Sequence, residues 1–222
     1  MNSNNEKIVL DIYSKFKSYK GSEHIATISS MMNLLEIIQT KLFREVLDFG
    51  AGIGTISALV LGNTTANITA VEKNAYCANE FKKHLLPNRR INLCSSLPKK
   101  LFDLCIIDDS ISVREIMGIF SASGDKVVIF IEGRRGISVA ILSLLSMFHR
   151  YSGEYFEGKS GWNPQYKNLH EKAGSYFIFT KSSLPNSVKS WLKRLERTDE
   201  RNNLKYFLLK KSKLLGIINK FR

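Results

Sequence analysis

Long hydrophobic runs are absent from this chain of 222 residues. No apolar stretch reaches the ~18 residues that a membrane-spanning helix needs. The segment from Met1 to Lys7 is polar and carries no apolar stretch of the secretory kind. Internal repeats and low-complexity segments are also missing. With a hydrophobic fraction of 44%, the chain has the composition of a globular protein, and we expect one cytoplasmic domain with a sizeable core.

Cysteine is scarce, and its spacing fits no metal-binding pattern. The chain has three cysteines, at Cys77, Cys94 and Cys105. Cys94 and Cys105 lie in apolar runs, where a buried and reduced thiol is the expected state. Cys77 is expected to face solvent from a helix. The spacing argues against a cysteine-based metal centre.

Acidic residues are fewer than basic ones, with 20 Asp and Glu against 33 Lys and Arg, for a net charge of +13. Residues 182–222 contain 11 basic and 3 acidic residues and so carry +8 of that charge. Such an excess favours acidic partners, namely nucleic acid, an anionic membrane surface or a phosphorylated substrate. A biased genome that is rich in Lys, Asn and Ile codons is an alternative explanation.

This basic tail has the pattern of amphipathic helices. One segment begins near Ser187 and places apolar residues such as Trp191 opposite basic ones such as Lys193. Helices of this kind lie on anionic membranes or bind the phosphates of RNA. They can also pack on their own domain or form an oligomer interface. The sequence leaves all of these alternatives open.

The chain does contain a glycine-rich turn between an expected strand and an expected helix. Val46–Phe49 is typical of a buried strand, and the apolar run Ile56–Leu61 begins a helix. Three glycines lie between them at alternate positions, Gly50, Gly52 and Gly54. Glycines let the backbone turn sharply and let a ligand approach without a Cβ in the way. A carboxylate at Asp48 would repel a pyrophosphate but suits a positive amino group, which points to S-adenosylmethionine rather than NAD.

This turn resembles motif I of the Rossmann-like (class I) S-adenosylmethionine-dependent methyltransferases. The family pattern is an acidic residue followed by x-G-x-G-x-G, and Asp48-Phe49-Gly50-Ala51-Gly52-Ile53-Gly54 matches every defined position. Phe102-Asp103-Leu104-Cys105-Ile106-Ile107-Asp108 resembles the motif IV strand, which in small-molecule O-methyltransferases often ends in Asp-Gly; here Asp109 replaces the glycine. The resemblance covers about 45–181. It implies an α/β fold with a doubly wound, mostly parallel seven-stranded sheet, and the cofactor S-adenosyl-L-methionine.

Hydrophobic periodicity predicts the order of the elements. We expect a helical cap over 1–42, a methyltransferase core over 43–181 and a basic helical extension over 182–222. The expected helices cover 5–19, 24–40, 75–86, 111–119 and 137–149, with Ser22 as N-cap of the second. The expected strands cover 45–49, 68–72, 90–94, 102–108, 126–132, 154–157 and 175–181, with a turn at Ser123 to Asp125. The residues 95–101 between the third and fourth strands are too few for a full crossover helix.

The cofactor residues are expected at the carboxyl ends of the strands. Glu72 ends the second strand 24 residues after Asp48, and a carboxylate there suits the two vicinal ribose hydroxyls. Lys73 and Asn74 follow it and can line the adenosine, and the resemblance places Ser95 or Ser96 near the adenine. The expected cofactor-binding residues are Asp48, Gly50, Ala51, Gly52, Gly54, Glu72, Lys73, Ser95 and Asp108.

The first candidate for the chemistry is Asp108, as the base that removes the acceptor proton or as an anchor for the acceptor. It can instead cap the following helix. Asp109 is a second candidate, and His170 is a third, in a loop over 158–174 whose aromatic residues can form a lid. His24, in the helical cap, is a further candidate base.

A metal ion is not expected. Some O-methyltransferases hold magnesium with an Asp-Asn pair after strand five, but here Glu132-Gly133-Arg134-Arg135 follows, and adjacent arginines oppose a cation. Arg134 and Arg135 suit the carboxylate or phosphate of an acidic acceptor.

The acceptor is therefore expected to be a small molecule or a glycan, methylated on oxygen. The Pro-Pro-aromatic motif of base-methylating enzymes is absent, and Pro98 is followed by Lys99 rather than by a nucleophilic cysteine. An RNA methyltransferase that uses the basic tail is the alternative, and a non-catalytic cofactor-binding module is another.

Overall fold

The computed structural model describes residues 3–86, 88–108, 111–112, 115, 118–119, 123–132, 156–157 and 175–180. The helical elements are α1 (Ser3–Lys17), the 3-10 turn η1 (Ser22–His24), α2 (Ile28–Thr40), α3 (Thr55–Asn63) and α4 (Ala75–Leu85). The strands are β1 (Glu45–Phe49), β2 (Asn67–Val71), β3 (Ile91–Cys94), β4 (Phe102–Ile107), β5 (Ser123–Ile131), β6 (Phe156–Glu157) and β7 (Ser175–Thr180).

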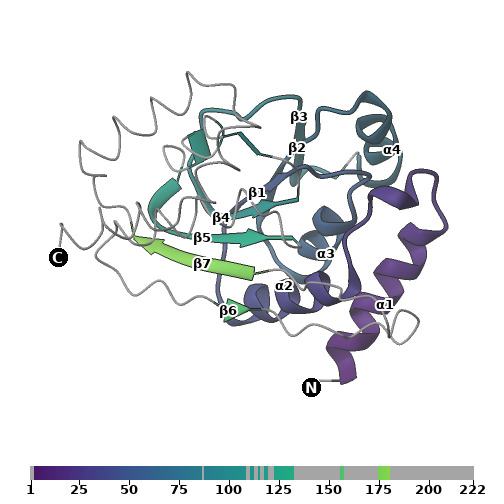
Figure 1. The fold of residues 1–222 in the computed structure, drawn as a ribbon, viewed down its shortest axis with the longest axis horizontal. Helices are drawn as coiled ribbons and strands as arrows, with labels where there is room; N and C mark the ends of the chain where they lie inside the picture. Colours follow the sequence, from purple (N-terminus) through teal and green to yellow (C-terminus); the bar gives the residue numbers. More distant parts are fainter. Residues whose placement is uncertain are drawn as a thin grey trace, which may run out of the picture.

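The strands form one sheet in the order β3-β2-β1-β4-β5-β7-β6 (Figure 1). Strands β1 to β5 pair in parallel, and β7 pairs antiparallel with both β5 and β6. The expected α/β fold with a parallel sheet is therefore confirmed. The order runs outward from β1 in both directions, so it reverses between β1 and β4, and ligands of open parallel sheets bind outside the carboxyl edge at such a point.

Two expected boundaries were wrong. Helix α2 begins at Ile28 rather than at residue 24, and its N-cap is Thr27, whose side chain accepts from the backbone N–H of Ser30. Ser22 instead starts η1 after Gly21, which has a φ of 86°. Strand β5 begins at Ser123, where we expected a turn, because it pairs there with Phe102 of β4.

The cysteine expectations also need two corrections. Cys77 is buried on α4 rather than exposed to solvent, because it packs with Phe16 and Ile53 in a small cluster. Cys105 is buried in β4 as expected, whereas Cys94, also expected to be buried, is half-buried at the end of β3.

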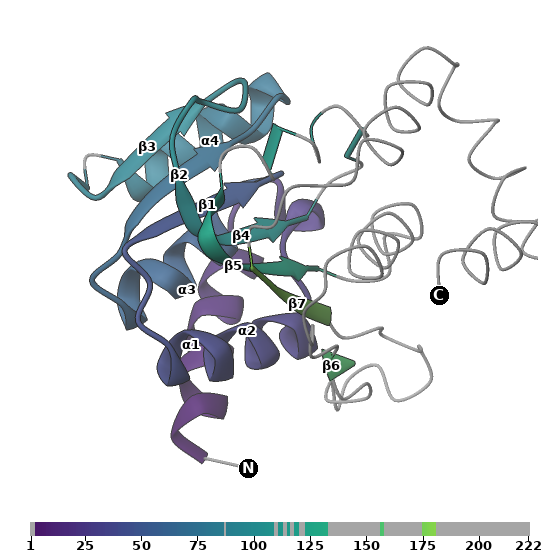
Figure 2. The same cartoon turned by 90° about the vertical axis from the view of Figure 1, so that its left-hand side faces the viewer.

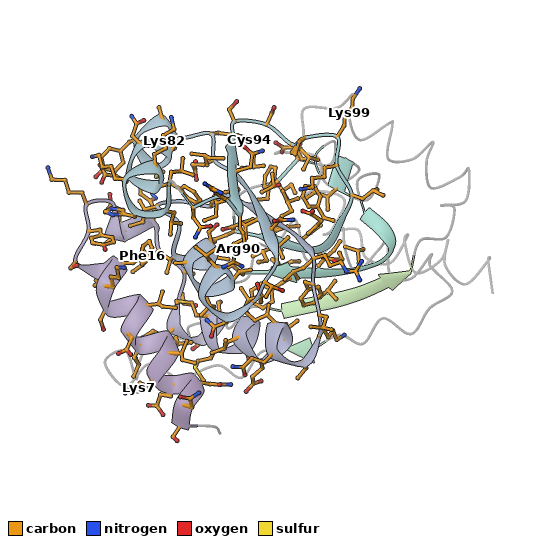
Figure 3. All side chains as sticks on the ribbon, turned by 180° about the vertical axis from the view of Figure 1, so that it is seen from behind. Lys7, Phe16, Lys82, Arg90, Cys94 and Lys99 are labelled. Atoms are coloured by element: carbon orange, nitrogen blue, oxygen red, sulfur yellow. The ribbon has the colours of Figure 1, made fainter. Side chains whose placement is uncertain are left out.

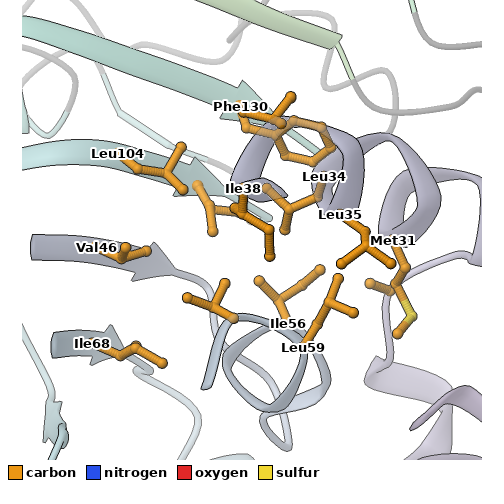
Figure 4. Packing of buried hydrophobic residues seen from close by; sticks show 14 of the residues in the cluster. Met31, Leu34, Leu35, Ile38, Val46, Ile56, Leu59, Ile68, Leu104 and Phe130 are labelled. Atoms are coloured by element: carbon orange, nitrogen blue, oxygen red, sulfur yellow. The ribbon is translucent and has the colours of Figure 1, made fainter. Parts of the chain in front are cut away.

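Helices α1 to α4 cover one face of the sheet (Figure 2). The side chains that point to this face alternate along each strand, for example Val46 and Asp48 in β1 and Leu104 and Ile106 in β4. Figure 4 shows Leu35 of α2 beside Leu59 of α3, and Leu34 of α2 beside Phe130 of β5. The opposite face is buried too: Leu47, Cys105 and Ile129 have no exposed surface, as expected for a parallel sheet covered on both sides.

Arg90 binds backbone carbonyls at the amino end of the β2–β3 pair. Its guanidinium group donates hydrogen bonds to the backbone carbonyls of Leu61, Thr64 and Ala66 at 2.7–3.3 Å (Figure 3). These carbonyls lie at the end of α3 and beyond it, where a cation is favourable. The arginine thus joins the start of β3 to the α3–β2 turn.

None of the helices in the described part of the chain has the length and apolar character required to cross a bilayer.

Candidate functional site

The glycine turn after β1 forms the centre of the carboxyl edge. Gly50, Gly52 and Gly54 all have positive φ angles, of 84°, 55° and 101°, which L residues with side chains rarely adopt. The backbone N–H groups of Gly50 and Ala51 both donate to the carbonyl of Val71, at 2.9 and 3.2 Å. The turn is thereby fixed to the end of β2, and helix α3 starts directly after it.

Two of these glycines are also required by close packing. A Cβ at Gly52 would lie 2.4 Å from the backbone oxygen of His24, so η1 rests directly on the turn. A Cβ at Gly54 would lie 2.4 Å from Leu85 Cδ1 and 3.0 Å from Phe81 Cδ2, so α4 packs against the start of α3. The motif therefore serves the fold as well as any ligand.

Glu72, directly after β2, joins two backbone segments of the carboxyl edge. Its Oε2 accepts from the N–H of Gly52 at 2.7 Å, and its Oε1 accepts from the N–H of Asn74 at 2.7 Å. Asn74 in turn caps α4, because its side chain accepts from the N–H groups of Tyr76 and Cys77. Each carboxylate oxygen has two lone pairs, so Glu72 keeps acceptor capacity for the hydroxyls of a ligand.

Asp48 lies beneath the glycine turn and has no exposed surface. Ser57 of α3 donates a hydrogen bond of 2.6 Å to Oδ2, while the buried Oδ1 has no hydrogen-bond partner. Burial, with the negative charge of Glu72 adding to it, raises the pKa of Asp48 to about 7, although the Ser57 hydrogen bond acts in the opposite direction. Asp48 therefore faces α3 rather than the open edge. Any effect on a ligand comes from its charge and not from direct contact.

Asp108 lies on the other side of the point where the strand order reverses. It follows β4 directly and is half-buried, and its backbone N–H donates to the carbonyl of Phe49 at 2.8 Å. The structure thus brings Asp108 next to the end of β1. Asp109, His170, Arg134 and Arg135 lie outside the described residues.

The segment 21–27, here called the strap, runs from the glycine turn to the end of β5. At one end, Gly21 packs so closely that a Cβ there would lie 2.8 Å from Ile53 Cγ2. At the other end, the N–H of Thr27 donates to Oε1 of the buried Glu132 at 3.2 Å. His24, a candidate base, lies in the strap with 46% of its side chain exposed. The strap therefore forms part of the wall of the carboxyl edge.

A cleft of about 820 Å³ opens beside the ends of β2 and β3. Lys73 and Ser95, both expected to bind cofactor, line it together. Its other lining residues are Ser96, Leu97, Pro98, Lys99, Lys100, Leu101, Ser112, Glu115 and Gly118. The ammonium group of Lys73 forms an ion pair with Glu115 and lies 5.2 Å from the ring centre of Phe49. Among the described residues, no group of three or more His, Cys, Asp or Glu side chains is arranged to hold a metal ion.

Sequence reasoning missed several residues of this edge. The Thr27–Glu132 and Ser57–Asp48 contacts carry no sequence signal, because only the folded chain brings their partners together. Glu115 was detectable. Its spacing from Ser112 is that of a capping box, in which the Glu115 N–H donates to Ser112 Oγ and the Ser112 N–H donates to Glu115 Oε2.

No protein-family model matches the sequence, and no curated protein matches it. Solved structures do match. An O-methyltransferase from Bacillus cereus, solved with S-adenosylhomocysteine (SAH), is 14% identical with a TM-score of 0.58, covering 82% of this chain and 92% of its own. An S-adenosylmethionine-dependent O-methyltransferase from Thermotoga maritima is 14% identical with a TM-score of 0.60, covering 80% and 72%.

A third match is the precorrin-6y C5,15-methyltransferase of Geobacter metallireducens, which is 17% identical with a TM-score of 0.57, covering 74% of this chain and 94% of its own. At such identities the likeness concerns the fold. The chain has the Rossmann-like fold of the class I methyltransferases.

Proposed function

We propose that this protein is an S-adenosylmethionine-dependent methyltransferase. The observation that carries the proposal is the contact between the glycine turn and Glu72. The Gly52 N–H donates to a carboxylate that still has lone pairs for the two ribose hydroxyls. The turn and the ribose acceptor are thus held in one unit, and the structural neighbours with this fold are methyltransferases, one of them solved with SAH.

The charges of the edge favour a cationic ligand over a pyrophosphate. In dinucleotide sites, free backbone N–H groups at the start of a helix bind phosphate oxygens. Here the N–H of Gly52 is already bound to Glu72, and Asp48 lies beneath the same turn. An anionic phosphate would meet the carboxylate of Glu72, whereas a sulfonium and an amino group would be attracted to it.

We propose a place for each part of the cofactor. Glu72 would hold the ribose, the cleft at Lys73 and Ser95 would hold the adenine, and Asp108 would face the amino group or the acceptor. When bound, S-adenosylmethionine supplies an electrophilic methyl group for an in-line displacement. The protein contributes the alignment of the acceptor, which is worth up to ~7–11 kcal/mol in well-oriented reactions. Asp108 is our candidate for the base that takes the acceptor proton.

We further propose that the acceptor oxygen belongs to a small molecule or a glycan. The motif IV strand and its terminal Asp108 support this proposal, as do the O-methyltransferases among the neighbours. An acidic acceptor would suit Arg134 and Arg135. The protein is then expected to work in the cytoplasm, with the basic tail available for an anionic membrane surface or for oligomer contacts.

The test is a calorimetric titration with SAH and, separately, with NAD. We expect SAH to bind and NAD to give no signal; binding of NAD alone would overturn the proposal. A screen of small-molecule, glycan and RNA acceptors with a methyl-labelled donor then identifies the acceptor class. Tight binding of SAH with no methyl transfer to any acceptor would support the non-catalytic module instead.

The charge of the tail favours a second candidate, an RNA methyltransferase. Residues 182–222 carry +8, and phosphate contacts make RNA affinity fall steeply with added salt. Methyl incorporation into tRNA or rRNA, together with such a salt dependence, would support this candidate over the small-molecule one.

A further inference from the structure

The strand order and register require the connection between β3 and β4 to be extended. It must cross β2 and β1, which at ~4.8 Å per strand means ~14 Å sideways. The register pairs Ile91 with Ile68, Ile68 with Val46, and Val46 with Leu104, so Cys94 and Phe102 differ by five residues along the strands, or ~17 Å. The diagonal is ~22 Å, and the eight steps from Cys94 to Phe102 span at most ~27 Å. No helix fits into this connection.

This connection passes over the sheet face that lies opposite α1 to α4. Lys73 lies over the ring of Phe49, and Phe49 points away from Asp48 and therefore away from α3. The cleft that Lys73 lines lies on the same side. It extends from Ser95, directly after β3, to Leu101, directly before β4. An extended segment occupies less width than a crossover helix would. The cleft lies beside this segment.

Two contacts join the walls of this cleft. Lys73 pairs with Glu115, which links the end of β2 to the turn that starts at Ser112. A Cβ at Gly118 would lie 2.8 Å from Leu97 Cδ2, so the connection rests directly on that turn. The cleft is therefore a built space of about 820 Å³, at the upper end of the ~300–1,000 Å³ of sites for drug-sized ligands. This volume is larger than one purine base occupies.

We propose that this cleft extends the base subsite and accepts a neutral substituent on the edge of the purine, so that adenosyl ligands enlarged at the base still bind. The proposal rests on the proposed function, because Glu72 as ribose acceptor directs the base toward its neighbour Lys73. A purine placed there has its outer edge toward Ser96 and Leu97, where the cleft continues.

The lining favours a neutral substituent. The charge of Lys73 is compensated by Glu115, and that of Lys100 by Glu45 at 2.6 Å. Lys99 points away from the body of the protein (Figure 3). Leu97, Pro98 and Leu101 offer apolar surface, and the hydroxyl groups of Ser95 and Ser96 offer hydrogen bonds.

The experiment compares two probes by calorimetry, SAH and SAH that carries a benzyl group on N6 of the adenine. We expect the full-length protein to bind the enlarged probe within about five-fold of SAH, because open space imposes no overpacking. A loss of more than about ten-fold for the enlarged probe, with SAH bound normally, overturns the proposal and leaves the proposed function intact. Failure of SAH itself to bind overturns the proposed function, and this proposal with it.

A variant that fills the cleft sharpens the test. Leu101→Trp, at the far end of the cleft, should weaken the benzylated probe by about ten-fold or more while SAH changes by less than about three-fold, since the indole competes with the substituent only. Ser14→Trp, at an exposed position of α1, is the matched control and should change neither affinity. If Leu101→Trp weakens both probes equally, the cleft does not distinguish the substituent from the base, and the proposal is wrong.

Discussion

The carboxyl edge of the sheet is built differently on the two sides of the point where the strand order reverses. On the β1–β2 side, Glu72 joins the glycine turn and the start of α4 by two hydrogen bonds of 2.7 Å, within about twenty residues of chain. On the β5 side, the N–H of Thr27 donates to Glu132 at 3.2 Å, and these residues are 105 apart in the chain. The contacts of the first side join residues close in the chain, and we expect this side to be rigid; the β5 side includes a contact between residues far apart in the chain.

The largest expected effect concerns Asp48, beneath the rigid side. Its pKa is raised from 3.8 to about 7, so the folded protein keeps a proton between about pH 4 and pH 7 that the unfolded chain has lost. Folding therefore binds protons in this window, and the free energy of unfolding falls as the pH rises through it. Asp48→Asn stays neutral throughout. Between pH 4 and pH 8, the free energy of unfolding of Asp48→Asn should rise relative to that of the wild type by up to roughly 4 kcal/mol, at ~1.36 kcal/mol per pKa unit.

Urea unfolding of both proteins across this pH range measures the shift. Ser57→Ala serves as the companion variant, because it removes a hydrogen bond that favours the charged form of Asp48 and should extend the decline to higher pH. A constant difference between wild type and Asp48→Asn at every pH would show that Asp48 ionises in the folded state as it does in water.

The next effect tests how closely the strap lies on the glycine turn. Gly52→Ala places a Cβ 2.4 Å from the His24 oxygen and forces a side chain onto a φ of 55°. We expect a loss of about 3 kcal/mol, which combines left-handed strain with overpacking against backbone. Thermal unfolding measures it.

Gly62→Ala is the matched control for this substitution. Nothing lies within 4 Å of a Cβ at Gly62 in α3, so alanine there should be neutral or slightly stabilising. Equal losses in the two variants would mean that the turn has room for a side chain and that the strap does not rest on it.

The rigid side was predictable from sequence and the β5 side was not, for a physical reason. Strand β1, the glycine turn and Glu72 depend on residues close in the chain, and the spacing of Asp48, Gly50, Gly52 and Gly54 indicated their arrangement. The start of α2 was misplaced, because residues 24–27 continue the helical periodicity while the tertiary contact to Glu132 holds Thr27 in an extended conformation. Likewise, burial decides that Asp48 faces Ser57, and no local pattern reports it.

Glu72 offers a smaller but more specific effect. Glu72→Ala removes the proposed acceptor of the ribose hydroxyls, and a hydrogen bond to a charged group is worth about 1.5–3 kcal/mol. We expect the affinity for SAH to fall by roughly thirty-fold, at 1.4 kcal/mol per factor of ten, as measured by calorimetry. Glu36→Ala, at an exposed position of α2, should bind SAH like the wild type. Unchanged affinity in Glu72→Ala would refute the ribose assignment.

The smallest expected effect tests whether the β5 side opens more readily than the β1–β2 side. Glu132→Leu fills a buried position with a side chain of similar size but removes the acceptor for the Thr27 N–H, whereas Glu132→Gln keeps an acceptor oxygen. A lost hydrogen bond of this kind costs about 1 kcal/mol, so the Thr27 amide should exchange its hydrogen roughly five-fold faster in the leucine variant. The amides of Gly50 and Ala51, which bond to Val71, should keep their exchange rates in both variants.

If the leucine and glutamine variants exchange alike at Thr27, the bond does not hold the strap. If Gly50 and Ala51 also exchange faster, the two sides open together, and the contrast between a rigid and a mobile side is wrong.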